Sequence, residues 1–293
     1  MNTTHHRYAT VQGRQMFYRE AGPADAPAVV LLHGFPASSF MFRDLIPALA
    51  DRYHVVAPDH IGFGFSDAPR VDEFDYTFDA LTAHTTELLA RLGISRYAIY
   101  VHDYGAPIGW RLALQDPDAV TAIVTQNGNA YDAGFVEGFW KTVWAYQREQ
   151  TPETEDAIRQ ALSLDMIKWQ YVTGTPDATL VSPDTWNHDY ALVNRPGNAE
   201  VQLALFRDYA TNAPMYPRLH EYLRDTQVPV LAAWGRNDPI FGPDGARAFA
   251  DDVEDAEIHL IDGGHFLLES DGDEVADLVH DFLDRTQPQP AGR

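Results

Sequence analysis

Short apolar runs alternate with longer segments of helical periodicity along most of the chain. The runs are rich in aliphatic and β-branched residues, and they predict part of an opening hairpin at 14–20 and further strands at 28–32, 53–57, 97–101, 120–125, 228–234 and 257–261. Apolar positions three and four residues apart predict helices at 42–51, 78–92, 104–115, 243–250 and 266–283. Strands that alternate with helices in this way are typical of an α/β fold with a mostly parallel sheet flanked by helices.

The alternation stops once, between residues 130 and 213. This segment shows no strand pattern, and it contains helical patterns at 139–147 and 154–164. Its four tryptophans are Trp140, Trp144, Trp169 and Trp186. Ligands of open α/β sheets bind at the carboxyl edge of the strands, so we expect a helical cap over that edge. The sequence therefore predicts an α/β core of residues 1–129 and 214–293 and a helical cap of residues 130–213.

The composition of the chain argues against some classes of binding partner. Of the 293 residues, 45% are hydrophobic and 22% are charged, which is typical of a globular protein with a large core. Lys and Arg number 21 against 43 Asp and Glu, and a net charge of −22 repels nucleic acid and anionic membranes. There is no cysteine to form disulfides or to ligate a metal, and the sequence shows neither a signal peptide nor a membrane-spanning run. We expect a cytoplasmic protein that binds neither nucleic acid nor membrane.

A turn with several polar, potentially catalytic side chains follows the predicted strand 97–101. The strand runs into His-Asp-Tyr-Gly at 102–105 and then into a predicted helix, which is the context of a nucleophile elbow with Asp103 at its centre. Such a turn is strained and favours small residues two positions to either side of the centre; Gly105 satisfies this and Val101 does not. Because the central residue is aspartate and no Gly-x-Ser-x-Gly occurs, the sequence argues against a serine esterase.

A histidine base and a carboxylate that orients it are expected after two later strands, acid first. Asp238 follows the predicted strand 228–234 in Gly-Arg-Asn-Asp-Pro, and His265 follows the strand 257–261 in Asp-Gly-Gly-His-Phe. The alternative place for the acid, after the strand 120–125, holds only the uncharged side chains of Gln126, Asn127 and Asn129. With Asp103 as nucleophile, Asp238 and His265 complete a predicted catalytic triad.

The first parallel strand is followed by His-Gly-Phe-Pro at 33–36. There the backbone N–H of Phe35 can pair with the N–H of Tyr104 to form an oxyanion hole. Together these features resemble the α/β-hydrolase fold superfamily over nearly the whole chain. The aspartate at the elbow narrows the resemblance to the subgroup of epoxide hydrolases, haloalkane dehalogenases and haloacetate dehalogenases.

The chemistry explains why aspartate can serve as the nucleophile. A carboxylate displaces a leaving group at an sp³ carbon and forms an alkyl ester with the enzyme, and water activated by the histidine then attacks the ester carbonyl. The expected substrate is therefore a small apolar electrophile. This chemistry requires no cofactor and no metal, and the neighbouring pairs Asp59-His60 and His102-Asp103 lack the further ligands that a metal site needs.

Epoxide hydrolysis to a diol is the activity that we favour. Epoxide hydrolases combine His-Gly-x-Pro, with an aromatic x, and two cap tyrosines that bind the epoxide oxygen and protonate it. Tyr146 and Tyr209 match these tyrosines by position. The chain departs from the family pattern in three places: the motif Asn-Trp-Tyr-Arg is missing around Tyr209, and Val101 and Tyr104 replace a glycine and a tryptophan.

Haloalkane dehalogenation is the main alternative. These enzymes offer the halide two side-chain N–H donors, at positions that are Phe35 and Tyr104 in this chain. Phe35 has no side-chain donor, although Tyr104, Trp140 or Trp144 could substitute. His33, Trp140 and Trp144 are accordingly further candidates for substrate binding.

The sequence favours two other functions less. Haloacetate dehalogenases hold the substrate carboxylate with arginines at positions that are here Tyr104 and Pro107, which leaves that carboxylate without its partner. A non-catalytic receptor with this fold commonly lacks a triad member, whereas all three candidates are present in this chain.

Overall fold

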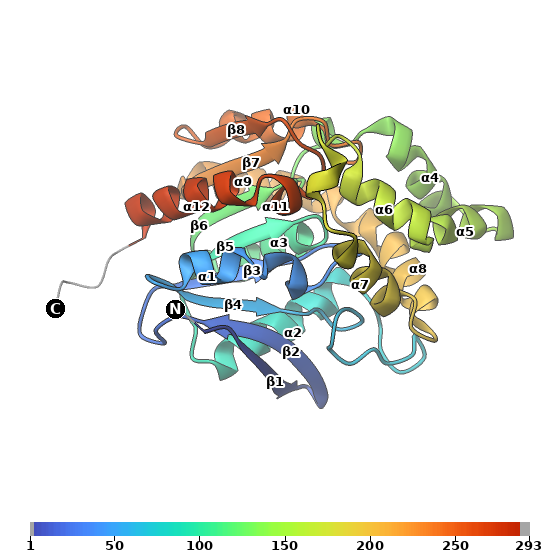
Figure 1. Cartoon of the computed structure of the whole chain (residues 1–293), viewed down its shortest axis with the longest axis horizontal. Helices are drawn as coiled ribbons and strands as arrows, with labels where there is room; N and C mark the ends of the chain where they lie inside the picture. Colours follow the sequence, from blue (N-terminus) through green and yellow to red (C-terminus); the bar gives the residue numbers. More distant parts are fainter. Residues whose placement is uncertain (1–2, 288–293) are drawn as a thin grey trace.

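A computed structural model describes residues 3–287, so positions 1–2 and 288–293 of the predicted core lie outside the described residues. An eight-stranded sheet has the order β1-β2-β4-β3-β5-β6-β7-β8 (Figure 1). β2 pairs antiparallel with β1 and β4, and all other neighbours are parallel. The strands are β1 His5–Val11, β2 Arg14–Ala21, β3 Ala28–Leu32, β4 His54–Pro58, β5 Tyr97–His102, β6 Val120–Gln126, β7 Val230–Gly235 and β8 Glu257–Ile261. The predicted α/β fold is confirmed.

Helices cover both faces of the sheet. α1 Leu45–Leu49 and α12 Gly272–Thr286 pack against each other on the face nearer the viewer in Figure 1. α2 Phe78–Arg91, α3 Gly105–Gln115 and α9 Tyr216–Thr226 form a contiguous layer on the other face. α10 Pro243–Arg247 follows β7, and the short α11 Leu267–Ser270 precedes α12.

Three helical segments differ from the sequence expectation. The helix expected at 42–51 is only α1, preceded by a 3-10 turn at Ser39–Phe42, and the helix expected at 266–283 is divided between α11 and α12. α9 was not expected, although its buried residues Tyr216, Leu219, Tyr222 and Leu223 follow a helical spacing.

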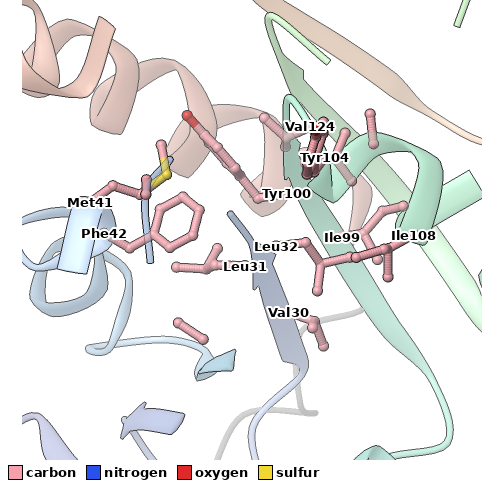
Figure 2. Close-up of a cluster of buried hydrophobic side chains, with 14 of the residues drawn as sticks. Val30, Leu31, Leu32, Met41, Phe42, Ile99, Tyr100, Tyr104, Ile108 and Val124 are labelled. Atoms are coloured by element: carbon pink, nitrogen blue, oxygen red, sulfur yellow. The ribbon is translucent and has the colours of Figure 1, made fainter. Parts of the chain in front are cut away.

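The central strands lie deep in the core because both of their faces are covered. Every residue of β3 and β5 is buried, which explains their continuous apolar sequence. Figure 2 shows how successive side chains serve the two faces: Leu31 and Tyr100 point toward Phe42, whereas Leu32 and Ile99 lie on the side of Ile108. Burying each such side chain contributes about 1.5–3 kcal/mol. This packing makes the carboxyl edge of the strands a rigid support.

Between β6 and β7 the chain is mainly helical, and Phe135 forms an isolated β-bridge with Phe241. Its helices α4 to α8 gather beside the ends of the strands, at the right of Figure 1. They are α4 Glu137–Arg148, α5 Pro152–Arg159, α6 Leu164–Val172, α7 Pro183–Val193 and α8 Asn198–Asp208. Within residues 3–287 no helix combines the length and apolar character needed to cross a membrane.

Candidate active site

Asp103 lies at the sharp turn between β5 and α3. Its φ of 47° is in the left-handed region, which costs a non-glycine residue free energy. Two glycines permit the turn: a Cβ on Gly105 would lie 2.0 Å from the carbonyl oxygen of Leu32, and one on Gly34 would lie 2.3 Å from the Cβ of Asp103. The glycines therefore let the elbow and the loop after β3 meet.

Val101, two positions before Asp103, is accommodated by glycines on other elements. A Cβ on Gly109 of α3 would lie 2.5 Å from Cγ1 of Val101, and a Cβ on Gly128 would lie 3.1 Å from Cγ2. The elbow needs space at this point, and the missing side chains of Gly109 and Gly128 provide it. The sequence expectation of a small residue at 101 overlooked these two neighbours.

The carboxylate of Asp103 is buried and held by backbone donors. Oδ1 accepts the N–H of Phe35 at 2.6 Å, and the N–H of Tyr104 also bonds the carboxylate. Burial raises the pKa of Asp103 to about 6, against the opposing effects of His265 and the two N–H groups. The two predicted donors are thus brought together on one carboxyl group.

His265 and Asp238 form a buried pair behind this carboxylate. Nδ1 of His265 donates to Oδ2 of Asp238 at 2.7 Å, and both side chains are inaccessible to solvent. Nε2 of His265 has no hydrogen-bond partner among the described residues. Burial lowers the pKa of His265, but the charge of Asp238, its hydrogen bond and the charge of Asp103 outweigh burial and raise it overall. An imidazole held in this tautomer can accept a proton at Nε2.

Polar residues at the end of β6 fix this pair in place. Nδ2 of Asn127 donates to Oδ2 of Asp238 at 2.7 Å, and the amide of Ile240 donates to Oδ1 at 2.7 Å. The carbonyl of His265 accepts from Nε2 of Gln126 at 2.8 Å and from Nε2 of His102 at 3.1 Å. Gln126 and Asn127 were not expected to take part because they carry no charge, yet both donate a hydrogen bond to this pair.

Several aromatic rings pack around Tyr104, the residue that follows Asp103. The ring of Tyr104 lies 5.9 Å from that of Phe35, 6.0 Å from Phe206 and 5.7 Å from Tyr209, centroid to centroid. Tyr209 is buried against Trp140, 4.7 Å away, and Asp103 is among the charges that act on its hydroxyl. Burial first, and then the charges of Tyr216, Asp103 and Tyr104, raise the pKa of Tyr209 well above its usual value. A tyrosine of the segment 130–213 is therefore buried beside Tyr104, the residue that follows Asp103.

Tyr146, the other predicted tyrosine, lies on α4. It is buried on α4, but the charges that act on it after burial are those of Glu155, Arg207 and Arg159, and no contact among the described residues joins it to Asp103. An interaction with Asp103 is therefore recorded for Tyr209 and not for Tyr146 among the described residues.

The remaining candidates for substrate binding are His33, Trp140 and Trp144. Nε1 of Trp140 donates to the carbonyl of Ile240 at 2.9 Å, and Trp144 is 37% exposed. Nε2 of His33 accepts the amide N–H of His60 at 3.1 Å, while burial lowers the pKa of His33 to about 4 and keeps the ring neutral. His33 thus fastens two loops, and neither tryptophan offers a free N–H beside Asp103.

A cavity of about 400 Å³ opens between α4, α5, α6 and α8. Two of its lining residues belong to the surroundings of the triad, since Phe206 packs 5.2 Å from Phe35 and Pro239 directly follows Asp238. Most of its other lining side chains are apolar, among them Val136, Phe139, Val143, Ile158, Met166 and Trp169. An apolar compartment therefore lies among these helices, and its lining residues do not include Asp103, Asp238 or His265.

Comparison with known proteins agrees with this architecture. Residues 27–271 match the family model described as the alpha/beta hydrolase fold. An uncharacterized hydrolase of Saccharomyces cerevisiae is 42% identical over 90% of this chain and 92% of its own, and a haloalkane dehalogenase of Mycobacterium marinum is 41% identical over 90% and 87%. The crystal structure of epoxide hydrolase A from Mycobacterium thermoresistibile, 26% identical, superposes with a TM-score of 0.76 and covers 98% of this chain and 100% of that one. The chain therefore belongs to the α/β-hydrolase fold family and is a hydrolase.

Proposed function

We propose that this enzyme hydrolyses epoxides to diols through an ester formed on Asp103. The observation that carries the proposal is the pairing of two groups at the site. A buried carboxylate is held by the N–H of Phe35 and feels the charge of His265, and Tyr209, whose ring packs 5.7 Å from that of the neighbouring Tyr104, feels the charge of Asp103. An epoxide needs both a nucleophile and a proton donor, because its oxygen remains on the substrate as the ring opens.

In the first step, Oδ2 of Asp103 attacks an epoxide carbon while the N–H of Phe35 holds Oδ1. The C–O bond of the ring breaks, and the oxygen takes the proton of Tyr209. The product is a hydroxyalkyl ester of Asp103. Burial favours this attack, because a carboxylate that has lost its hydration reacts more readily than one in water.

In the second step, Nε2 of His265 takes a proton from water, and the resulting hydroxide attacks the ester carbonyl. The oxyanion forms on Asp103 itself, where the N–H groups of Phe35 and Tyr104 stabilise it. Asp238 stabilises the imidazolium through its 2.7 Å bond to Nδ1. When the tetrahedral intermediate collapses, the imidazolium returns its proton to the departing alkoxide, and the diol leaves.

The same proposal gives the helical segment 130–213 its role as a cap. It supplies Tyr209, and residues of α4, α5, α6 and α8 line the apolar cavity. Such a compartment fits the apolar substituent of a small epoxide and disfavours charged substrates. The N-terminal and C-terminal segments, 1–129 and 214–293, would then form the core that carries Asp103, Asp238 and His265.

Haloalkane dehalogenation is the second candidate, and the 41% identity to the Mycobacterium marinum haloalkane dehalogenase favours it. The site argues against it. A departing halide needs N–H or similar donors, yet Phe35 has no side-chain donor, Nε1 of Trp140 is bonded to Ile240, and Trp144 is 37% exposed. Of these candidates, the buried hydroxyl of Tyr104, which has no hydrogen-bond partner among the described residues, remains as a donor to the halide.

A panel of apolar epoxides and matched bromoalkanes separates the two candidates. Diol formation is measured by chromatography, and halide release is measured in the same reactions. We expect diol from the epoxides at a rate well above that of the Asp103→Asn variant. Bromide release without diol formation would instead identify a dehalogenase.

A further inference from the structure

Gln202 carries a fully buried amide near the middle of α8. The residue is 0% exposed, and neither Oε1 nor Nε2 has a hydrogen-bond partner among the described residues. A buried amide without a partner costs free energy, because it has given up its hydrogen bonds to water. Natural proteins tolerate such a cost mainly where the group has a function, so Gln202 is a candidate for ligand binding.

The helix α8 turns Gln202 toward two loops of the core. The side chain of Val201 packs against the loop after β4, where a Cβ on Gly62 would lie 2.9 Å from its Cγ1. The ring of Phe206 packs against the loop after β3, 5.2 Å from the ring of Phe35. Successive residues of an α-helix are about 100° apart, so Gln202 lies between Val201 and Phe206 around the helix. Its side chain therefore leaves α8 on the side of these two loops.

Both loops contact the elbow that carries Asp103. In the loop after β3, the N–H of Phe35 donates to Oδ1 of Asp103 at 2.6 Å. In the loop after β4, the ring of Phe63 packs 6.4 Å from that of Tyr104, which follows Asp103 at the elbow. The side of α8 that carries Gln202 therefore faces the surroundings of Asp103.

A further unpartnered atom lies on the same face of α8. Asn198 precedes Gln202 by four residues, which makes the two side chains neighbours on the helix surface. Nδ2 of Asn198 donates to the carbonyl of Val193 at 2.9 Å, whereas its buried Oδ1 has no partner among the described residues. Four residues after Gln202, the ring of Phe206 packs 6.0 Å from that of Tyr104. The buried face of α8 therefore begins with two amides and ends with an aromatic ring at the elbow.

We propose that the amide of Gln202 binds a hydroxyl substituent of the substrate, so that the enzyme prefers epoxides that carry a hydroxyl group. This inference rests on the proposed function and narrows its substrate class. The amide donates through Nε2 and accepts at Oε1, and a hydroxyl is a small neutral group that also does both. Because Gln202 lies one helical turn from Phe206, the hydroxyl belongs a few carbon atoms from the epoxide ring. The apolar cavity, which Gln202 does not line, remains for the apolar part of the same substrate.

The surroundings favour a neutral group over a charged one. A buried charge needs an opposite charge beside it, and the side chains of Asn198 and Gln202 carry none. Arg195, just before α8, already donates from Nη1 to the carbonyl of Gly64 at 2.9 Å, so it has no pair of free donors for a carboxylate. The negative charge of Asp103 also repels an anionic substrate. A hydroxyl meets none of these obstacles.

The test measures kcat/KM for pairs of epoxides. Each pair consists of an apolar 1,2-epoxyalkane and its analogue with a hydroxyl group a few carbon atoms from the ring. Gln202→Met removes the amide and nearly keeps the size of the side chain, and Gln115→Met is the control, because Gln115 is exposed on α3. We expect wild type and Gln115→Met to prefer a hydroxylated epoxide about ten- to hundred-fold, and Gln202→Met to lose this preference.

Two further measurements do not depend on epoxide turnover. In calorimetric titrations, hexanamide, a neutral ligand that both donates and accepts, should bind wild type about ten-fold more tightly than Gln202→Met. The melting temperature of Gln202→Met should equal or exceed that of wild type, because an apolar side chain replaces an amide without a partner. A glutamine that only held α8 in place would lower the melting temperature when it is replaced.

The outcomes separate this inference from the proposed function. If diols form but no hydroxylated epoxide is preferred, or if Gln202→Met keeps the preference, the inference is wrong and the epoxide hydrolase proposal stands. A preference for the matching epoxide with a carboxylate in place of the hydroxyl would also overturn it. If no epoxide is hydrolysed, the proposed function fails; weaker binding of hexanamide to Gln202→Met would then still support a polar binding site, and equal binding would overturn it.

Discussion

The ring of Tyr171 lies face to face with that of Phe266, with centroids 3.9 Å apart and ring planes 6° apart. Tyr171 belongs to α6, and Phe266 directly follows His265 and packs 5.0 Å from His102. The hydroxyl of Tyr171 in turn bonds the buried carboxylate of Asp189 on α7. A stacked pair thus joins the helical segment to the loop that carries the predicted base.

The first prediction concerns this stack. Tyr171→Ala should lower the free energy of unfolding by about 3–5 kcal/mol, because it removes a large buried ring. Tyr171→Phe keeps the ring and leaves Asp189 short of one donor, so the cost should be about 1–3 kcal/mol. Urea denaturation of the two variants measures the difference, and equal losses would show that the stack contributes nothing.

The rates of ester formation and ester hydrolysis should depend differently on pH. Ester formation needs Asp103 ionised, and since burial raises its pKa to about 6, this rate should fall as the pH drops through about 6. Ester hydrolysis needs neutral His265, whose pKa is raised above 6.5, so that rate should already fall at a higher pH. Lowering the pH from 8 toward 6 should therefore make the ester accumulate. Rapid-quench measurements across this range test the order, and an ester that never accumulates would contradict it.

Asp238 should matter for the second step. Asp238→Asn removes the charge that stabilises the imidazolium while the shape of the side chain is retained, so we expect ester hydrolysis to slow by at least about 100-fold and ester formation to slow far less. Asp262→Asn is the control, because it removes an exposed carboxylate from the loop next to His265. Equal slowing of both steps in Asp238→Asn would reduce Asp238 to a turn residue.

The elbow should tolerate no side chain at Gly105. The added Cβ of Gly105→Ala would lie 2.0 Å from the backbone oxygen of Leu32, so the variant should lose about 3 kcal/mol or more of stability. A Cβ at Gly138, on α4, meets nothing within 4 Å, and Gly138→Ala should leave stability within about 1 kcal/mol of wild type. Thermal unfolding of the pair checks this, and similar melting temperatures would contradict the close approach.

Local patterns allowed much of the core to be predicted. The strands 28–32 and 257–261 have the predicted bounds, because both are apolar runs closed by turn residues. Asp103, Asp238 and His265 could be selected because each follows such a strand at the same edge of the sheet. That edge brings distant residues together without any contact being visible in the sequence.

The residues that the sequence could not place depend on helix orientation and on partners far along the chain. Tyr146 was chosen by distance along the chain, and the charges that act on it are those of Glu155, Arg207 and Arg159. Asn127 was dismissed for lacking charge, although its amide donates to Asp238.

Trapping the ester on Asp103 tests the central claim most directly. His265→Gln removes the base of the second step and leaves the nucleophile intact, so incubation with an apolar epoxide should add the mass of one epoxide to the protein. Mass spectrometry of peptides should place it on Asp103, and the double variant Asp103→Asn/His265→Gln should remain unmodified. An adduct on another residue, or undiminished diol formation by His265→Gln, would contradict the account.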